Sequence, residues 1–431
     1  MTTDWRARVL EELDGSATDL VAFLADLVRM PSISGSEVEN GVQDHMAGAF
    51  ERVGLDVDHW QVPLEQRLAA PDFPGMEVDR DEAWGLVGRL PGLGAGPTLM
   101  LNGHVDVVPA GDRSTWSGGD PFSGRVDGDV VYGRGSCDMK AGVVAALWAV
   151  RALRLARVPL LGDVLLASVQ GEEDGGLGSY DLLQRGWRAD ACVIPEPTGL
   201  DLVPANAGSL TFRLRVPGHA THASRRTAGV SAIEKFWPVW EALGDLERRR
   251  NQAVHPLFAR WDIAYPLSIG TVRSGDWASS VPDLLVAEGR LGVALDEPVD
   301  QARTALQDAV RRAGEKDPWL RTHPVVVEWW GGQFESGRLV ESSDLLARVG
   351  AAHANVTGGA SQATWGAPYG SDLRLLTNIG GIPTVHYGPG DVALAHGPDE
   401  SVPISETLTC ARALAVLALD YCGVDATAAR W

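Results

Sequence analysis

The sequence predicts an α/β domain that is interrupted by a smaller α+β domain. Apolar runs that end in glycine and charged residues alternate with helical patterns in the first half of the chain, and this texture returns near the C-terminus. Between these parts the order of elements is strand, helix, strand, strand, helix, strand, which builds a ferredoxin-like sandwich. We therefore expect the α/β domain to comprise residues 1–207 and 331–431, and the insertion to comprise residues 208–330.

Length and composition are those of a globular protein of about two domains. The chain has 431 residues, of which 45% are hydrophobic, enough for a sizeable core. Its formal net charge of −20 argues against nucleic acid or an anionic membrane as a partner. No apolar run approaches a membrane span and the N-terminus lacks a secretory pattern, so we expect a cytoplasmic protein. The four cysteines are scattered and predict reduced thiols: Cys137, Cys192, Cys410 and Cys422.

The first elements of the chain are helices that serve packing. An apolar stripe predicts a helix over residues 17–30, which stops at Pro31. Ser36 and Glu39 have the spacing of a capping box and predict a second helix that runs toward Val53.

Several later segments end in potential ligands. A short apolar strand over residues 98–101 leads to His104, and Asp106 follows on the same side of an extended backbone. A carboxylate there can hold the imidazole and free its other nitrogen for a metal, although His-x-Asp alone is weak evidence. A hairpin over residues 126–132 delivers Asp138 at the start of a helix. Taken alone, Asp138 is typical of a helix N-cap residue.

Two further strands end in carboxylates. The strand over residues 162–170 leads to Glu172 and Glu173, and the strand over residues 190–194 leads to Glu196. Like charges packed at a strand tip are costly unless a cation neutralises them. The remaining elements are predicted strands at 210–216, 268–272, 284–295, 324–330 and 384–386, and predicted helices at 230–250, 298–313, 342–353 and 405–421.

These residues form one constellation with His396, which follows the strand at 384–386. In open α/β sheets, ligands bind where the strands end at the carboxyl edge. Two imidazoles with three or four carboxylates suit a borderline divalent metal, above all zinc. Five ligands exceed what one tetrahedral zinc takes, so two ions that share one carboxylate fit better.

The motifs in their order resemble the M20 family of metallopeptidases and deacylases, in particular the acetylornithine deacetylase and succinyl-diaminopimelate desuccinylase group. The resemblance covers nearly the whole chain. It implies a catalytic domain of zinc-exopeptidase type, interrupted by a lid and dimerisation domain. The motifs that carry it are Gly103-His104-Val105-Asp106, Gly133-Arg134-Gly135 with Asp138-Met139-Lys140, Glu172-Glu173, Glu196-Pro197, and Ala395-His396 with Glu400.

The resemblance implies a role for each of these side chains. Asp138 bridges two zinc ions, for which cobalt or manganese can substitute. His104 and Glu196 complete one site, and Glu173 and His396 complete the other. Glu172 is the general base and Asp106 orients His104. Relatives have a cis peptide after the bridging aspartate, so we expect Asp138–Met139 to be cis.

Other matched residues concern the substrate. His222, in the insertion, matches a histidine that contacts the scissile carbonyl oxygen from the partner subunit of a homodimer. The alternative is a surface loop histidine. Arg290 matches an arginine that grips a substrate carboxylate, and Ser371 and Asp372 match a substrate-side loop. One departure is Ser280 before Val-Pro, where relatives often have asparagine, so the acyl group stays open.

The resulting functional prediction is a hydrolase that cleaves an N-acyl amino acid or a similar small amide. A dipeptidase or carboxypeptidase acting on short peptides is the alternative within the family. A non-catalytic binding protein on a hydrolase scaffold is the alternative outside it. Such a protein would be expected to lose ligands or the base, whereas all six positions are filled here.

Overall fold

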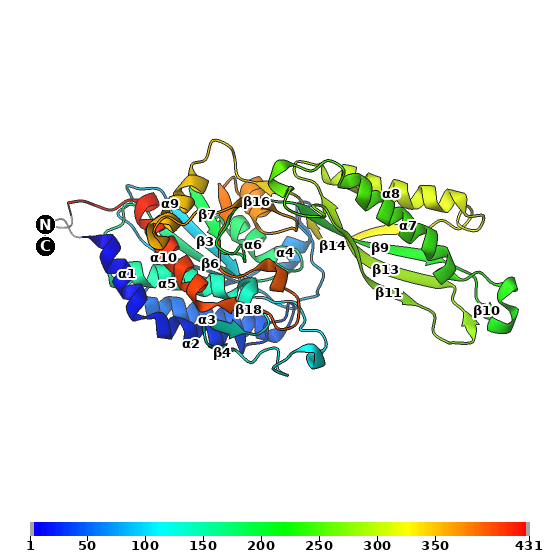
Figure 1. Cartoon of the computed structure of the whole chain (residues 1–431), viewed down its shortest axis with the longest axis horizontal. Coiled ribbons are helices and arrows are strands. Elements are labelled where there is room, and N and C mark those ends of the chain that lie inside the picture. The colour runs from blue at the N-terminus through cyan, green and yellow to red at the C-terminus, as the bar shows by residue number, and fades with distance from the viewer. Residues whose placement is uncertain (1–3, 428–431) are drawn as a thin grey trace.

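The computed structural model describes residues 4–427 and arranges them around two sheets, each with its own hydrophobic core (Figure 1). The larger sheet has nine strands in the order β1-β2-β6-β3-β7-β17-β8-β15, with β16 beside β8. Their bounds are β1 (Asp56–Gln61), β2 (Trp84–Leu90), β3 (Leu99–His104), β6 (Val164–Val169), β7 (Ala191–Ile194), β8 (Leu202–Asn206), β15 (Gly337–Arg338), β16 (Thr364–Ala367) and β17 (Thr384–His386).

The centre of this sheet is parallel and fully buried. Strand β3 pairs in parallel with β6 and β7, so that Leu101 lies opposite both Leu166 and Val193. Strand β17 continues the parallel set beside β7. Every residue of β3, β6 and β7 is buried, which explains why these strands read as continuous apolar runs. Their carboxyl ends therefore meet at one edge of the sheet.

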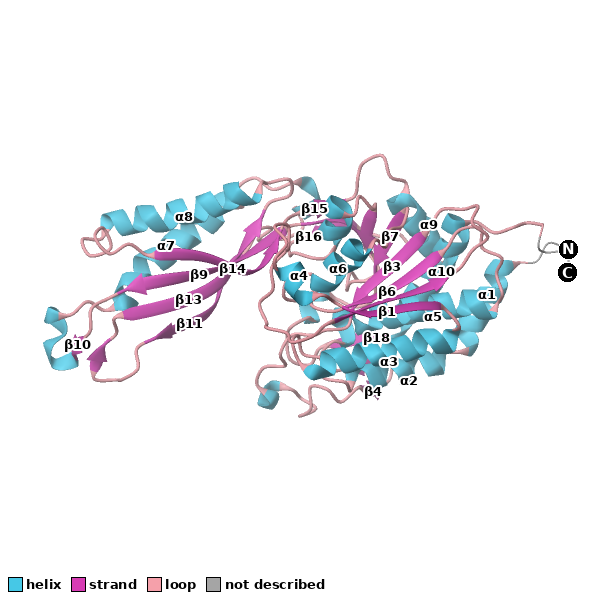
Figure 2. Cartoon of the chain, turned by 180° about the vertical axis from the view of Figure 1, so that it is seen from behind, coloured by secondary structure: helices cyan, strands magenta, loops and turns pink. Residues whose placement is uncertain are grey.

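Helices cover both faces of the larger sheet (Figure 2). A small three-stranded sheet lies beside them and contains β4 (Arg125–Asp127), β5 (Val130–Tyr132) and β18 (Ser401–Pro403). The helices of this part are α1 (Trp5–Gly15), α2 (Ala17–Val28), α3 (Glu37–Val53), α4 (Leu64–Leu68), α5 (Ala141–Leu155), α6 (Leu177–Arg185), α9 (Leu345–Thr357) and α10 (Ile404–Cys422).

The predicted capping box at the start of α3 does not form. The side chain of Ser36 makes no capping hydrogen bond. Glu39 instead accepts the backbone N–H groups of Gly35 at 2.7 Å and Gly171 at 3.1 Å, and it pairs with the buried guanidinium of Arg80 at 3.1 Å. A buried carboxylate gains more from a cation and two N–H donors than from its own helix terminus.

The smaller part, which we call the lid, has the predicted ferredoxin-like order. Its antiparallel sheet runs β11 (Leu267–Ser274), β13 (Leu284–Val293), β9 (Gly208–Pro217), β14 (Val326–Phe334). Helices α7 (Ala232–Arg250) and α8 (Val299–Lys316) pack against it around a core that includes Phe212, Leu243 and Leu306. The α/β fold class with an inserted lid is thus confirmed, while the domain limits at 208 and 330 stay predictions.

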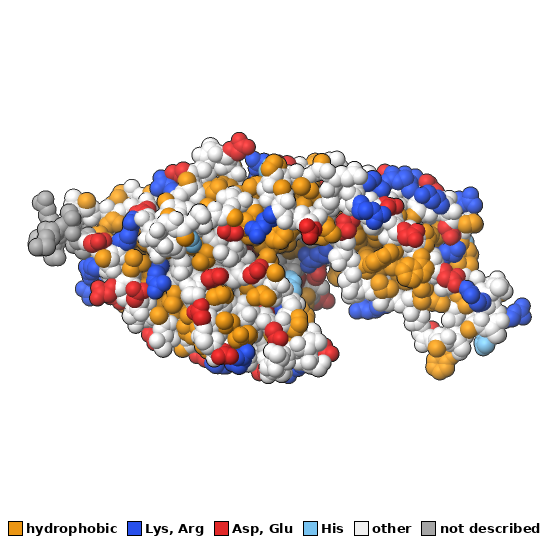
Figure 3. Space-filling model, in the orientation of Figure 1, with side chains coloured by type: hydrophobic (Ala, Val, Ile, Leu, Met, Phe, Trp, Pro, Cys, Tyr) orange, Lys and Arg blue, Asp and Glu red, His pale blue; other side chains and the backbone are white. Residues whose placement is uncertain are grey.

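The surface of the lid carries exposed apolar side chains. On α7, Phe236, Val239 and Leu243 face the core, whereas Trp237 and Trp240 are 60% and 47% exposed. Figure 3 shows apolar side chains on the lid, and a hollow between the lid and the larger part. Within residues 4–427, no helix has the length and apolar character needed to cross a membrane. The four cysteines are buried and free, as expected.

Candidate metal centre

The carboxyl edge of the larger sheet brings the predicted ligands together. His104 is the last residue of β3, Glu172 and Glu173 follow β6, and Glu196 follows β7. Asp138 lies in the turn that precedes α5. His396 lies in the loop after a short 3-10 turn, Val392–Leu394. The parallel register of β3, β6 and β7 explains this convergence, because it aligns the ends of the three strands.

Asp138 stands at the centre of two groups of ligand atoms. Its Oδ1 lies 3.2 Å from Nε2 of His104, and its Oδ2 lies 3.5 Å from Nε2 of His396. Glu196 completes the first group, with Oε1 4.0 Å from the imidazole of His104, and Glu173 completes the second, with Oε2 3.0 Å from that of His396. Within each group the three ligand atoms lie within 4.8 Å of one another. Each group can therefore hold one ion, with Asp138 shared.

The electrostatics of this cluster favour cations. Burial raises the pKa of Glu172 well above its usual value, and the nearby carboxylate of Asp372 raises it further. Burial and the charge of Asp138 do the same to Glu196. The charge of Glu173 raises the pKa of His396 to about 11. Imidazole nitrogens with carboxylate oxygens form a donor set that suits zinc and neighbouring divalent metals.

The imidazole of His104 lies closer to the backbone carbonyl of Asp106 than to the carboxylate of Asp106. Nδ1 of His104 lies 2.9 Å from the carbonyl oxygen of Asp106 and 3.6 Å from its Oδ1. The carboxylate of Asp106 instead accepts the backbone N–H groups of Glu172 and Glu173, both at 3.3 Å, and the hydroxyl of Ser34 at 3.0 Å. Asp106 therefore joins the end of β3 to the loop that carries both glutamates.

The turn that carries Asp138 is held by Glu400. This buried carboxylate accepts the backbone N–H groups of Cys137 at 2.9 Å and Asp138 at 3.0 Å, and it pairs with Arg134 at 2.5 Å. The peptide bond between Asp138 and Met139 is cis, which confirms that prediction. Glu400 was singled out in the sequence only as part of a motif, and its contacts give it a positioning role.

A cavity of about 410 Å³ opens onto the cluster. Arg290 and Ser371 line it, and their contact with a substrate stays a prediction. Asp372 is 1% exposed and does not line it, so it lies behind the wall. Tyr369 lines the cavity and was missed. Its hydroxyl is buried and finds no hydrogen-bond partner within residues 4–427. A single tyrosine between proline and glycine gives no sequence signal of this placement.

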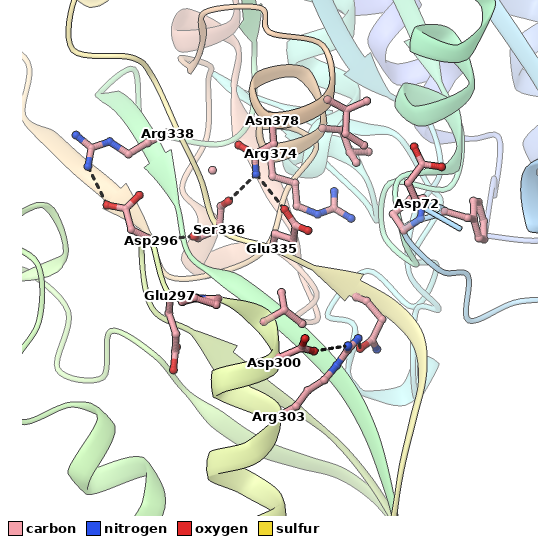
Figure 4. Close-up of a pocket in the computed structure, with 18 of the residues that line it drawn as sticks. Asp72, Asp296, Glu297, Asp300, Arg303, Glu335, Ser336, Arg338, Arg374 and Asn378 are labelled. Atoms are coloured by element: carbon pink, nitrogen blue, oxygen red, sulfur yellow. Dashed lines mark hydrogen bonds and ion pairs between the residues drawn. The ribbon is translucent and has the colours of Figure 1, made fainter. Parts of the chain in front are cut away.

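A larger cavity of about 690 Å³ lies at the junction of the lid with the larger part (Figure 4). Two pairs of its charged side chains contact each other: Asp300 lies 3.2 Å from Arg303, and Asp296 lies 2.9 Å from Arg338. None of the metal-ligand candidates lines it. This cavity is therefore separate from the candidate metal centre.

His222 lies far from the cluster within one chain. It belongs to β10 (Thr221–His222), at the outer end of the lid (Figures 1 and 2). Its side chain is exposed, and its Nδ1 lies 2.8 Å from the hydroxyl of Ser224. His222 therefore neither lines the site cavity nor belongs to either group of ligand atoms in this chain.

The fold and this site define a class, the hydrolases that act on C–N amide bonds with metal-dependent chemistry. The chain belongs to peptidase family M20/M25/M40, whose sequence profile matches residues 100–420. The predicted family and enzyme class are thereby confirmed.

Three known proteins illustrate what the chain is similar to. It is 28% identical to an N-formyl-4-amino-5-aminomethyl-2-methylpyrimidine deformylase of Bacillus subtilis, across 96% of this chain and 95% of that protein. It is 34% identical to a succinyl-diaminopimelate desuccinylase of Dinoroseobacter shibae, across 51% of this chain and 55% of that protein. The solved structure of the dipeptidase Dug1p from Saccharomyces cerevisiae has a TM-score of 0.78 at 14% identity, covers 98% of this chain and 99% of its own, and shows a shared fold.

Proposed function

We propose that the protein is a dinuclear zinc amidohydrolase that removes a small acyl group from an amine. The observation that carries the proposal is the position of Asp138, whose two oxygens face two different histidines, His104 and His396. A carboxylate in that position serves two ions at once. Two zinc ions bound there would acidify a water between them and polarise the amide carbonyl.

Glu172 is the general base in this proposal. It lies next to Glu173 at the end of β6 and lines the cavity, but it belongs to neither group of ligand atoms. A carboxylate that is free of a metal can take a proton from water and pass it to the leaving amine. The carboxylate of Asp106 accepts the backbone N–H group of Glu172. This hydrogen bond holds the loop of Glu172 and so sets the position of the base.

A formamide is the leading substrate class, because two relatives that match 96% and 97% of this chain are deformylases, whereas a probable carboxypeptidase of Aspergillus terreus matches 91% of it. The desuccinylase matches only about half of the chain. N-acyl amino acids and short peptides remain the alternatives, and the likeness to a dipeptidase concerns the fold alone. Against a non-catalytic binder stand the family of hydrolases to which the chain belongs and the presence of both groups of candidate ligands.

The proposal includes a homodimer in which His222 reaches the partner's metal centre. Its support is the position of His222 at the outer end of the lid, together with exposed Trp237 and Trp240 and the free edge of β11. A donor brought in from the partner can stabilise the developing oxyanion.

The experiment is a screen with metal analysis. Purified protein supplied with zinc or cobalt is incubated with N-formyl, N-acetyl and N-succinyl amines and with dipeptides, and amine release is followed. We expect close to two divalent ions per chain and release of amine from at least one small amide. Active protein without metal, or metal-loaded protein that cleaves none of these amides, would contradict the proposal.

A further inference from the structure

Arg290, the residue expected to grip a substrate carboxylate, is already paired with Glu77. The Nη2 atom of Arg290 lies 2.9 Å from Oε1 of Glu77, and 3.4 Å from the backbone oxygen of Glu173. Among the described residues that line the site cavity, Arg290 is the one lysine or arginine. Its partner therefore decides whether the cavity offers a positive charge to a substrate.

Glu77 is held in place from both sides of the domain junction. Its Oε1 accepts the hydroxyl of Thr211, on β9, at 2.6 Å, and the backbone N–H of Gly332, on β14, at 3.3 Å. Its own backbone N–H donates to Asp174 at 3.1 Å. A Cβ atom added at Gly331 would lie 2.4 Å from Cγ of Glu77, which shows how closely the side chain is packed. Glu77 is thus a fixed partner of Arg290.

This pairing changes the charge that a substrate meets. In the proposed site, two divalent cations balance four carboxylates, those of Asp138, Glu172, Glu173 and Glu196. The charge of Arg290 is balanced by Glu77. A substrate carboxylate next to Arg290 would therefore meet a like charge a few ångströms away, with no unbalanced cation to compensate for it.

We propose that Glu77 sets the substrate class of this site, by neutralising Arg290 and so favouring small amides whose amine portion carries no carboxylate. This inference rests on the proposed amidohydrolase function. It predicts discrimination between two amides that differ only by a carboxylate beside the nitrogen.

The test uses metal-loaded protein and two matched formamides, N-benzylformamide and N-formylphenylglycine. The wild type is expected to have the higher kcat/KM for N-benzylformamide. Glu77→Gln keeps an acceptor for Thr211 and Gly332 but removes the charge, so it is expected to shift the ratio toward N-formylphenylglycine on the order of tenfold. Glu65→Gln, an equal charge change at an exposed position on α4, is the control and should leave the ratio unchanged.

Calorimetry separates this inference from the proposed function, because it needs no turnover. Phenylacetate should bind the metal-loaded Glu77→Gln variant on the order of tenfold more tightly than the wild type, and 2-phenylethanol should bind both equally. Absence of hydrolysis of any amide would refute the proposed function, while the binding comparison still decides the role of Glu77. A wild type that prefers N-formylphenylglycine overturns the inference, even if Glu77→Gln does not fold. So does an unchanged phenylacetate affinity in the folded variant.

Discussion

The carboxylate of Asp106 accepts the backbone N–H of Glu172 at 3.3 Å, and so ties the end of β3 to the loop after β6. The adjacent N–H of Glu173 bonds to the same carboxylate. Asp106 is fully buried, and it contacts His104 mainly through its backbone oxygen. One aspartate thereby positions both His104, a candidate ligand, and the two glutamates, although it contributes to neither group of ligand atoms.

Replacing Asp106 with alanine is expected to lower kcat/KM or metal affinity by about 10- to 100-fold, because residues that support metal ligands typically contribute this much. The backbone contact to His104 remains in the variant, so part of the loss comes from the loop of Glu172 and Glu173. Steady-state kinetics and elemental analysis measure the two effects. Ser34→Ala removes only one hydrogen bond to Asp106 and should lose less. Wild-type kinetics in Asp106→Ala would contradict the positioning role.

The roles of the two adjacent glutamates can be distinguished by the metal content of their alanine variants. Glu172→Ala is expected to keep its metal and to lose a hundredfold or more in kcat, on the order seen for removal of a general base. Glu173→Ala is expected to lose metal, because Glu173 belongs to the ligand group of His396. Metal analysis of both purified variants gives the answer. Loss of metal from Glu172→Ala together with its retention in Glu173→Ala would reverse the two assignments.

Mixed dimers test whether His222 crosses to the partner subunit. One subunit carries Glu172→Ala and the other carries His222→Ala, and each homodimer is expected to be inactive. If His222 crosses, the site with intact Glu172 receives the intact His222 of its partner, and one working site per hybrid returns. Activity is measured after mixing under conditions in which native mass spectrometry shows hybrids. Hybrids without activity would rule the crossing out.

His386 is expected to lower the stability of the protein as the pH falls. Burial lowers the pKa of His386 to about 3, whereas the unfolded chain has an ordinary value of about 6.5. Between these values the unfolded state binds the proton and the folded state does not, so the free energy of unfolding falls as pH falls below about 6.5. His386→Gln should remove about 2 kcal/mol of that loss between pH 6.5 and 4.5.

Urea unfolding of metal-free protein at several pH values measures this effect, because metal release then makes no contribution. His219→Gln, at an exposed position on the lid, serves as the control and should retain the wild-type pH dependence. An equal slope in His386→Gln and the wild type would show that His386 is protonated in the folded protein.

The sequence was sufficient to predict most of the residues that the fold brings together at the candidate metal centre, because several of them follow a local pattern. A titratable side chain stands at the end of a buried strand, as His104 does, or just after it, as Glu196 does, and a parallel sheet brings such ends together without further information. The ferredoxin-like order of the lid was predictable for the same reason, since it depends on the order of local elements.

Contacts between segments that are distant in sequence could not be predicted in this way. Glu77 and Arg290 lie on different parts of the chain, and neither has a neighbour that indicates the other. The prediction of a capping box was wrong for a similar reason. Ser36 and Glu39 have the right spacing, but Glu39 pairs with Arg80, which is distant in sequence. Asp106 was expected to act on His104 through its carboxylate, and only the fold shows the N–H groups of Glu172 and Glu173 that bind it.

The chain enters and leaves the lid through two neighbouring strands. Ser209 at the start of β9 pairs with Phe334 at the end of β14, so the two junctions with the catalytic part lie side by side. Helix α1, the first described element, lies at the end of the molecule away from the lid (Figure 1). The lid is therefore attached at a single place. A segment of different length or chemistry can replace it between these two adjacent strand ends, and the order of strands in the larger sheet stays unchanged.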